Sequence, residues 1–179
     1  MTVRTIIEYP HPNLRLVSAP VTVFDEKLKE LIRDMFETMY QSQGIGLAAP
    51  QIDIQKQIVV IDVSEDHSQP LVLINPKITR REGSTAIDEG CLSVPLDYRA
   101  KVDRAEKITI EYFDEHGALQ QRDADDLLAI CMQHELDHLQ GKLFIDYLSS
   151  LKKGLYDKKL EKYRRYKRKA ENAKKSEHA

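Results

Sequence analysis

The sequence has little cysteine and no long apolar run. Two of its 179 residues are cysteine, too few for the disulfide framework on which small secreted domains depend. No stretch of eighteen apolar residues occurs, and positions 1–12 contain no apolar core of the kind found in secretory leaders. We therefore expect a cytoplasmic protein with no membrane-spanning helix.

Internal repeats and signs of a second domain are also missing. The length and the 41% of hydrophobic residues suit one soluble globular domain with a sizeable core. Charge is uneven, because residues 151–179 carry 12 Lys and Arg against 4 Asp and Glu, whereas residues 1–150 are acidic overall. We expect a main body at 1–150 and, within the same domain, a basic C-terminal helix at 151–179 that is dispensable for chemistry from about Tyr156 onward.

Hydrophobic periodicity predicts where the first helix and the strands lie. Apolar residues at three-and-four spacing predict a helix from Asp25 to Ser42, with Asp25 as its cap. Runs rich in β-branched and aromatic residues predict strands, and turn residues separate the last two of them. These strands are expected at 58–63, at 71–74, at 107–113 and from Ala118 onward.

A second helix is predicted at 127–140, directly after these strands. Asp123 is expected to cap it, Asp125 and Asp126 place negative charge in its first turn, and Gly141 ends it. A block of strands followed by a helix is typical of an α+β fold. We expect mainly antiparallel sheets packed on this central helix, with one helix before them and the basic helix after them.

The second helix contains the sequence His134-Glu-Leu-Asp-His138. Residues four apart lie on one helix face, about 6 Å apart along the axis, so two imidazoles can converge on one metal ion. Glu135 would lie beside that ion and can take a proton from a water that the metal activates. The alternative is a solvated helix face with two unrelated histidines, but the apolar stripe that they extend favours a partly buried metal.

A catalytic centre of this kind normally has three protein ligands. Phe144 occupies the position of the third histidine in the longer H-E-x-x-H-x-x-G-x-x-H pattern, and Glu161 lies in a basic run typical of a surface helix. Cys131 is too far along the helix from His138 to share an ion with both histidines. Cys91 remains, although spacing alone does not bring it near, and a disulfide between Cys91 and Cys131 is the alternative.

The segment Gly44-Ile-Gly-Leu-Ala-Ala-Pro-Gln51 consists almost entirely of small, apolar and proline residues. Such a loop lets another backbone approach closely. A phosphate-binding loop is the competing interpretation, but no Gly-Lys-Ser/Thr follows and Pro50 lacks an N–H donor. Gln51 is the one strong side-chain donor here, and it is either aimed at a substrate oxygen or bonded to nearby backbone.

Three segments together resemble a known family. Gly44–Gln51, Glu89-Gly-Cys-Leu-Ser93 and Gln133-His-Glu-Leu-Asp-His138, in this order and at these separations, are similar to the three motifs of bacterial peptide deformylases. The preceding helix and the basic tail also fit, so the resemblance covers nearly the whole chain. It implies a catalytic domain at 1–150 that hydrolyses the N-formyl group of the initiator methionine of nascent polypeptides and releases formate.

The resemblance implies a metal and the residues that bind it. Cys91, His134 and His138 would bind one divalent ion, Fe(2+) in most family members, although Zn(2+), Ni(2+) or Co(2+) can occupy the site. Glu135 would take a proton from the attacking water and later protonate the leaving amine.

The resemblance also implies how the substrate binds. The Leu92 N–H and the Gln51 amide would hold the oxyanion that forms during hydrolysis. Gly46 would leave room for the substrate backbone. The methionine side chain would enter a pocket lined by Ile45, Ile87, Leu127, Ile130 and Cys131.

Two other interpretations remain open. A general H-E-x-x-H metallopeptidase would keep the helix but give no role to Gln51 or Cys91. A non-enzymatic module that binds ribosomes or RNA would use the basic tail and leave the histidines structural. The family resemblance itself implies that a basic C-terminal helix can dock on the ribosome surface, which is rich in RNA phosphate, and we expect no membrane partner.

Overall fold

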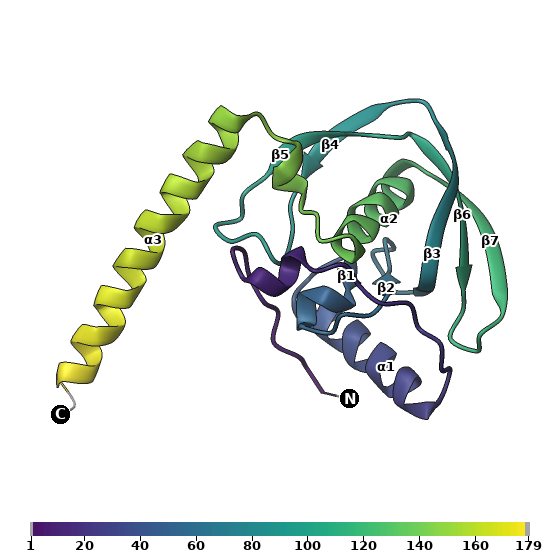
Figure 1. Cartoon of the computed structure of the whole chain (residues 1–179), viewed down its shortest axis with the longest axis horizontal. Coiled ribbons are helices and arrows are strands. Elements are labelled where there is room, and N and C mark those ends of the chain that lie inside the picture. Colours follow the sequence, from purple (N-terminus) through teal and green to yellow (C-terminus); the bar gives the residue numbers. More distant parts are fainter. Residues whose placement is uncertain (1, 178–179) are drawn as a thin grey trace.

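The structure, a computed structural model, describes the backbone of residues 2–177 and the side chains of residues 2–173. A body of strands and two helices is followed by a third helix that extends away from it (Figure 1). The α-helices are α1 (Glu26–Gln41), α2 (Asp126–Leu139) and α3 (Ser150–Glu177), and short 3-10 helices lie at Pro12–Arg15, Ala49–Ile52 and Phe144–Tyr147. The strands are β1 (Gly46–Ala48), β2 (Ile58–Ile61), β3 (Leu71–Glu82), β4 (Thr85–Glu89), β5 (Ala100–Arg104), β6 (Lys107–Phe113) and β7 (Leu119–Asp125).

One antiparallel sheet has the strand order β1-β2-β3-β6-β7, and β4 and β5 form a separate antiparallel pair. Along β2, Ile58 and Val60 pack in a cluster with α1, whereas Val59 and Ile61 pack in a cluster with α2. All four are buried, because a helix covers each face of this strand. This arrangement explains why the strand is apolar at every position. The predicted α+β class, with mainly antiparallel sheets packed on a central helix, is confirmed.

The ends of the helices agree with the sequence prediction except at the start of α2. Asp25 caps α1, because its carboxylate accepts a 3.0 Å hydrogen bond from the Leu28 N–H. Asp123 was expected to cap α2, and that prediction is wrong: β7 continues through it to Asp125, and Asp123 accepts a bond from the Thr109 hydroxyl on β6 instead. Hydrogen bonding between β7 and β6 thus extends the strand, and α2 starts only at Asp126.

Gly141 lies just beyond the end of α2, as predicted, with φ at +69°. A Cβ atom there would lie 2.4 Å from the backbone oxygen of Arg15. Both the left-handed backbone and the close approach of another segment require glycine at this turn.

The strands differ most from prediction where they are polar. β3 continues to Glu82 instead of ending at Ile74, because its exposed half pairs with β6 through register shifts near Pro76. β2 ends at Ile61, two residues early. Neither β4 nor β5 was predicted from the sequence, because their residues are mixed and polar and the two strands are stabilised by pairing with each other. These two strands bracket Cys91 and so decide where it lies.

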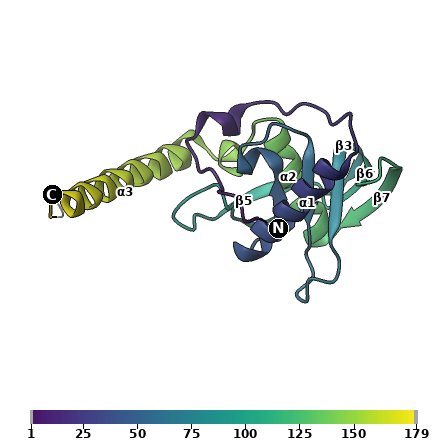
Figure 2. The same ribbon diagram turned by 90° about the horizontal axis from the view of Figure 1, so that it is seen from below.

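Helix α3 has two parts with different surroundings. Tyr156 and Leu160 are buried in the body, whereas Leu151 and Leu155 are more than half exposed. Beyond this start the helix projects away from every strand (Figures 1 and 2). We expected a dispensable tail from about Tyr156 onward, but Tyr156 is buried in the core. Arg164 also contacts the body, because it donates a hydrogen bond to the Tyr9 carbonyl. A truncation that leaves the core intact therefore has to begin beyond Arg164. Within residues 2–177, none of the helices combines the length and the apolarity needed to span a membrane.

Candidate metal centre

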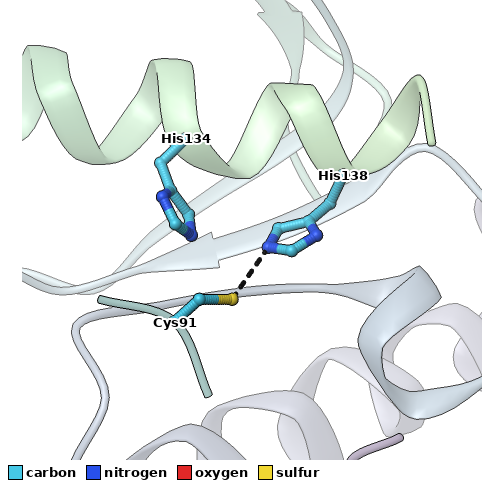
Figure 3. A group of neighbouring side chains, drawn as sticks. All are labelled: Cys91, His134 and His138. Carbon is cyan, nitrogen blue, oxygen red and sulfur yellow. Dashed lines mark hydrogen bonds between the residues drawn. The ribbon is translucent and has the colours of Figure 1, made fainter. Parts of the chain in front are cut away.

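The three candidate ligands come from two parts of the chain that the fold brings together. His134 and His138 lie one turn apart on the buried face of α2, and Cys91 follows β4. Sγ of Cys91 lies 3.3 Å from Nε2 of His138, and the centroids of the two imidazole rings are 5.2 Å apart. Figure 3 shows both imidazoles projecting from α2 toward the cysteine. The tertiary structure thus supplies the proximity that sequence spacing left open.

These donors fit a single metal ion. One ligand atom from each of the three residues lies within 4.8 Å of the others. A thiolate and two imidazoles leave one open position in a tetrahedral site, as catalytic metal sites do, and the set suits several transition metals. Cys91 and Cys131 are both free thiols, so the disulfide alternative is wrong. Among the residues that the structure describes, no other group of His, Cys, Asp and Glu has this spacing.

Glu89 orients the imidazole of His134. Its Oε1 lies 2.8 Å from Nδ1 of His134, and its two oxygens accept hydrogen bonds of 2.8 and 2.9 Å from the Arg104 guanidinium. Burial alone would raise the pKa of Glu89, but the bonds from Arg104 and His134 bring it below its usual value. An ionised Glu89 can only accept from Nδ1, so Nε2 of His134 keeps the lone pair that binds metal.

His138 is held in the neutral form that metal binding needs. Burial is the main cause that lowers the pKa of His138 well below its usual value, and the positive charges of Arg104 and Arg15 lower that pKa further. Its Nδ1 is buried without a hydrogen-bond partner among the described residues. The other ring nitrogen, Nε2, lies 3.3 Å from Sγ of Cys91 and is therefore the one placed to bind a metal.

Glu135 lies next to His134 on α2 but is not one of the three grouped donors. Burial raises the pKa of Glu135 to about 7, and its Oε2 has no hydrogen-bond partner among the described residues. A carboxyl group with a pKa near neutrality can accept and return a proton at neutral pH. Gly46 is its close neighbour, since a Cβ atom there would lie 2.5 Å from Oε1 of Glu135. Any larger residue at position 46 would displace this carboxylate.

Gln51 combines the two roles that the sequence left open. Its Oε1 accepts a 2.8 Å hydrogen bond from the Ala48 N–H, as expected for a glutamine that satisfies local backbone. Its Nε2 donates to Oγ of Ser93 at 3.2 Å and lies 3.6 Å from Sγ of Cys91. The backbone bond fixes the side chain, and the amide N–H group is thereby presented to the metal centre.

A cavity of about 640 Å³ opens beside these residues. Gln51, Cys91, His134 and Glu135 lie along it, and the remaining wall is partly apolar. The structure brings all the predicted substrate residues to this cavity together with Leu92: they are Ile45, Gly46, Ile87, Leu127, Ile130 and Cys131.

Comparison with known proteins identifies the family to which this chain belongs. The sequence profile described as Polypeptide deformylase matches residues 3–154. The chain belongs to the polypeptide deformylase family. It is 55% identical to the peptide deformylase of Pseudoalteromonas translucida (strain TAC 125) over 162 residues, which cover 90% of this chain and 96% of that protein.

Solved deformylase structures have the same fold. The crystal structure of a peptide deformylase from Legionella pneumophila superposes with a TM-score of 0.87 at 44% identity, covering 93% of this chain and 98% of that one. The Ehrlichia chaffeensis enzyme, solved in complex with actinonin, superposes with a TM-score of 0.86 at 38% identity, covering 91% and 98%.

Family membership establishes the reaction. Deformylases are metal-dependent hydrolases, and this enzyme removes the N-formyl group from the N-terminal methionine of newly synthesised polypeptides. The two rival interpretations, a general metallopeptidase and a non-enzymatic binding module, are therefore not favoured.

The deformylase fold also uses residues near the centre that sequence reasoning missed. Glu89 and Arg104 lie on the same face of the β4–β5 pair but at opposite ends of it, since Glu89 pairs with Ala100 and Arg104 with Thr85, so no local pattern in the sequence indicates that their side chains meet. The N-terminal segment holds the loops that contain Gln51 and Ser93, because the Ile7 N–H donates to the Gln51 carbonyl and the Tyr9 N–H donates to the Ser93 carbonyl, both at 2.8 Å. Because these contacts are made by backbone atoms, no pattern of side chains in the sequence predicts them.

Proposed function

We propose that Cys91, His134 and His138 hold one divalent ion, Fe(2+) in the native enzyme, and that this centre hydrolyses formyl-methionyl peptides. The observation that carries the proposal is the convergence of one thiol and two imidazole donors within 4.8 Å, at the side of a cavity that also contains Glu135 and Gln51. When bound, such an ion supplies Lewis-acid chemistry that activates water and polarises a carbonyl group. Zn(2+), Ni(2+) or Co(2+) would fit the same donors.

Glu135 carries the protons in this mechanism. With a pKa raised to about 7 by burial, its carboxylate takes a proton from the attacking water and returns it to the nitrogen of the leaving amine. Oε2, which has no hydrogen-bond partner among the described residues, is the oxygen that we assign to this transfer. Formate and a free N-terminal amine are the products.

Gln51 and Leu92 stabilise the oxygen on which charge develops. The Gln51 amide is fixed through its own oxygen by Ala48 and donates one N–H to Ser93, so the N–H that makes only the long 3.6 Å contact with Sγ of Cys91 is the one that would turn to the oxyanion. The Leu92 N–H would supply the second donor from the wall of the same cavity. Donors held in this way act mainly on the transition state.

The methionine side chain occupies the apolar part of the cavity. Ile130 and Cys131 are buried there, and Ile45, Ile87 and Leu127 are about two-fifths exposed, as expected for walls that a ligand covers. Gly46 leaves room for the substrate backbone to lie against this wall.

The decisive experiment measures formate release from a formyl-Met dipeptide by anaerobically purified protein, with metal content determined in the same sample. We expect turnover, about one metal ion per chain and no cleavage of unblocked peptides. Reconstitution with Fe(2+), Zn(2+), Ni(2+) or Co(2+) in parallel identifies the active ion. Cleavage of unblocked peptides without formate release would contradict the proposal. Because actinonin is bound by the Ehrlichia chaffeensis enzyme, inhibition by actinonin is a further expectation.

We further propose that the enzyme works in the cytoplasm, with residues 1–150 as its catalytic part and the basic helix docking on the ribosome surface. The charge of residues 151–179 is +8, from 12 basic and 4 acidic residues. A surface rich in phosphate would attract it strongly, and the attraction would fall steeply with salt.

Co-sedimentation with ribosomes tests the docking role. A chain truncated after Arg165 keeps the buried start of α3 but lacks five of the twelve basic residues, so it should keep dipeptide activity while its ribosome binding weakens. Equal sedimentation of full-length and truncated protein would contradict the docking role.

A further inference from the structure

The first turns of α3 belong to the wall of the active site. Tyr156 and Leu160 are 2% and 4% exposed and pack in an apolar cluster with Phe144. Cys91 packs against the same cluster, and the Phe144 ring lies 6.0 Å from the His134 ring. The start of α3 is therefore close to the metal centre, although the rest of the helix points away from the body (Figure 1).

Tyr156 holds the loop at 95–99, which follows Cys91 and forms part of the cavity. Its hydroxyl donates a 3.2 Å hydrogen bond to the carbonyl oxygen of Pro95, and its ring centroid lies 4.5 Å from that of Tyr98. Tyr98 and its two neighbours, at positions 97 and 99, line the cavity. One side chain from α3 thus contacts this loop at two points.

The loop depends on contacts of this kind because its backbone is strained. Leu96 and Asp97 have φ values of +70° and +48°, in the left-handed region that side chains with a Cβ rarely adopt. Asp97 and Arg99 line the cavity and are exposed to solvent, so they lie at its mouth. On the solvent side, no packing contacts with the described part of the chain stabilise the loop. Such a conformation persists only where the surroundings stabilise it.

We propose that Tyr156 is a positioning residue that shapes the mouth of the cavity at residues 97–99 and so governs binding of the peptide beyond the formyl-methionine. The proposal rests on the proposed function, in which the formyl group lies at the metal centre and the methionine side chain in the apolar part of the cavity. The substrate residues that follow the formyl-methionine must then pass through the mouth of the cavity at residues 97–99. Tyr156 contacts the loop rather than the reacting atoms, so its loss affects KM for longer substrates more than turnover.

The test compares Tyr156→Leu and Tyr156→Phe with the unaltered enzyme on two substrates, formyl-methionine amide and a formyl-Met tripeptide. Tyr156→Leu should raise KM for the tripeptide roughly five- to ten-fold and leave kcat within about two-fold. KM for formyl-methionine amide and the bound metal should stay nearly unchanged, because neither depends on the mouth. Tyr156→Phe keeps the ring and should restore most of the tripeptide affinity.

Two control variants separate positioning from stability. Leu160→Ala removes a buried side chain from the same cluster, so it should lower Tm without changing the ratio of the two KM values. Tyr166→Leu alters an exposed tyrosine of the same helix and should change neither quantity.

Three results would overturn the inference: an unchanged tripeptide KM, an equal rise for both substrates, or loss of metal in Tyr156→Leu. If that variant fails to fold, Tyr156→Phe decides, because loss of the bond to Pro95 should raise tripeptide KM about two- to three-fold, and no rise would contradict the inference. Absence of formate release by the unaltered, metal-loaded enzyme would instead contradict the proposed function.

Discussion

Nδ1 of His134 and Oε1 of Glu89 lie 2.8 Å apart, in a contact where both side chains are at most 10% exposed. The other side of Glu89 is bonded to Arg104, which also donates to Asp137 at 2.7 Å. Asp137 lies on α2 between the two histidines. A closed network therefore connects the metal-binding helix to the β4–β5 pair and fixes which nitrogen of His134 faces the centre.

Glu89→Gln should weaken metal binding about 10- to 100-fold, the usual effect of losing a partner that orients a ligand. The amide lacks the charge that pairs with Arg104 and no longer selects one tautomer of His134. Competition with a chelator measures the affinity. Glu106→Gln, an exposed glutamate, is the control and should bind metal normally. Equal affinities would show that Glu89 does not orient the ligand.

Cys91→Ala should abolish stable metal binding, because a thiolate supplies both a bond and a charge. Cys131→Ala is a matched control, since this second thiol lines the cavity but is outside the donor group. Metal analysis after gel filtration distinguishes the two. Full metal content in Cys91→Ala would mean that the third ligand lies elsewhere.

Glu135→Gln should keep the metal and lose nearly all turnover, about 10²- to 10⁴-fold, because the amide cannot accept a proton from water. Glu135→Ala should behave similarly in metal content and activity. Formate release at saturating substrate, normalised to bound metal, gives the comparison. Substantial residual activity would exclude the role of general base.

Gln51→Leu should lower kcat roughly 10²- to 10³-fold, the magnitude typical of removing one oxyanion donor. Leucine also leaves the Ala48 N–H without its acceptor. Gln51→Glu keeps that acceptor, loses the donor and adds a negative charge beside the oxyanion, so it should lower kcat at least as much while the local fold stays intact, and the two variants together separate the catalytic effect from local unfolding. A change confined to KM would make Gln51 a ground-state binder.

Asp34→Asn should lower Tm by about 2–4 °C at neutral pH. The pKa of Asp34 is lowered chiefly by the Thr2 N–H, at 2.7 Å, and also by the Arg4 guanidinium, despite partial burial. A depressed pKa in the folded state stabilises the protein above the unfolded value, about 3.9, and this contribution is lost as pH falls through the lower folded value.

Thermal melts of both proteins between pH 2 and 7 provide the measurement. The difference in Tm should be constant above about pH 5 and vanish at the acid end. A constant difference over the whole range would show that ionisation of Asp34 contributes nothing.

Local sequence determined much of the fold, and the structure confirms those parts. The three-and-four spacing of α1, its cap at Asp25 and the glycine stop at Gly141 are short-range features, governed by backbone hydrogen bonds and φ preference within a few residues. The same period placed His134 and His138 on one face of α2. The cavity residues were also predicted before the structure, because the order and separation of three motifs resemble those of one family.

Only the tertiary structure decided how distant parts meet. The β4–β5 pair is polar and without clear alternation, so its stability comes from pairing between segments, and this pairing helps to bring Cys91 to α2 and Glu89 to His134. Burial of Tyr156 likewise contradicts the local composition, because a helix rich in lysine and arginine gives no sign that one tyrosine fills the core beside the active site. Contacts between segments far apart in sequence form only when the whole chain is packed, so they cannot be predicted from local residue preferences.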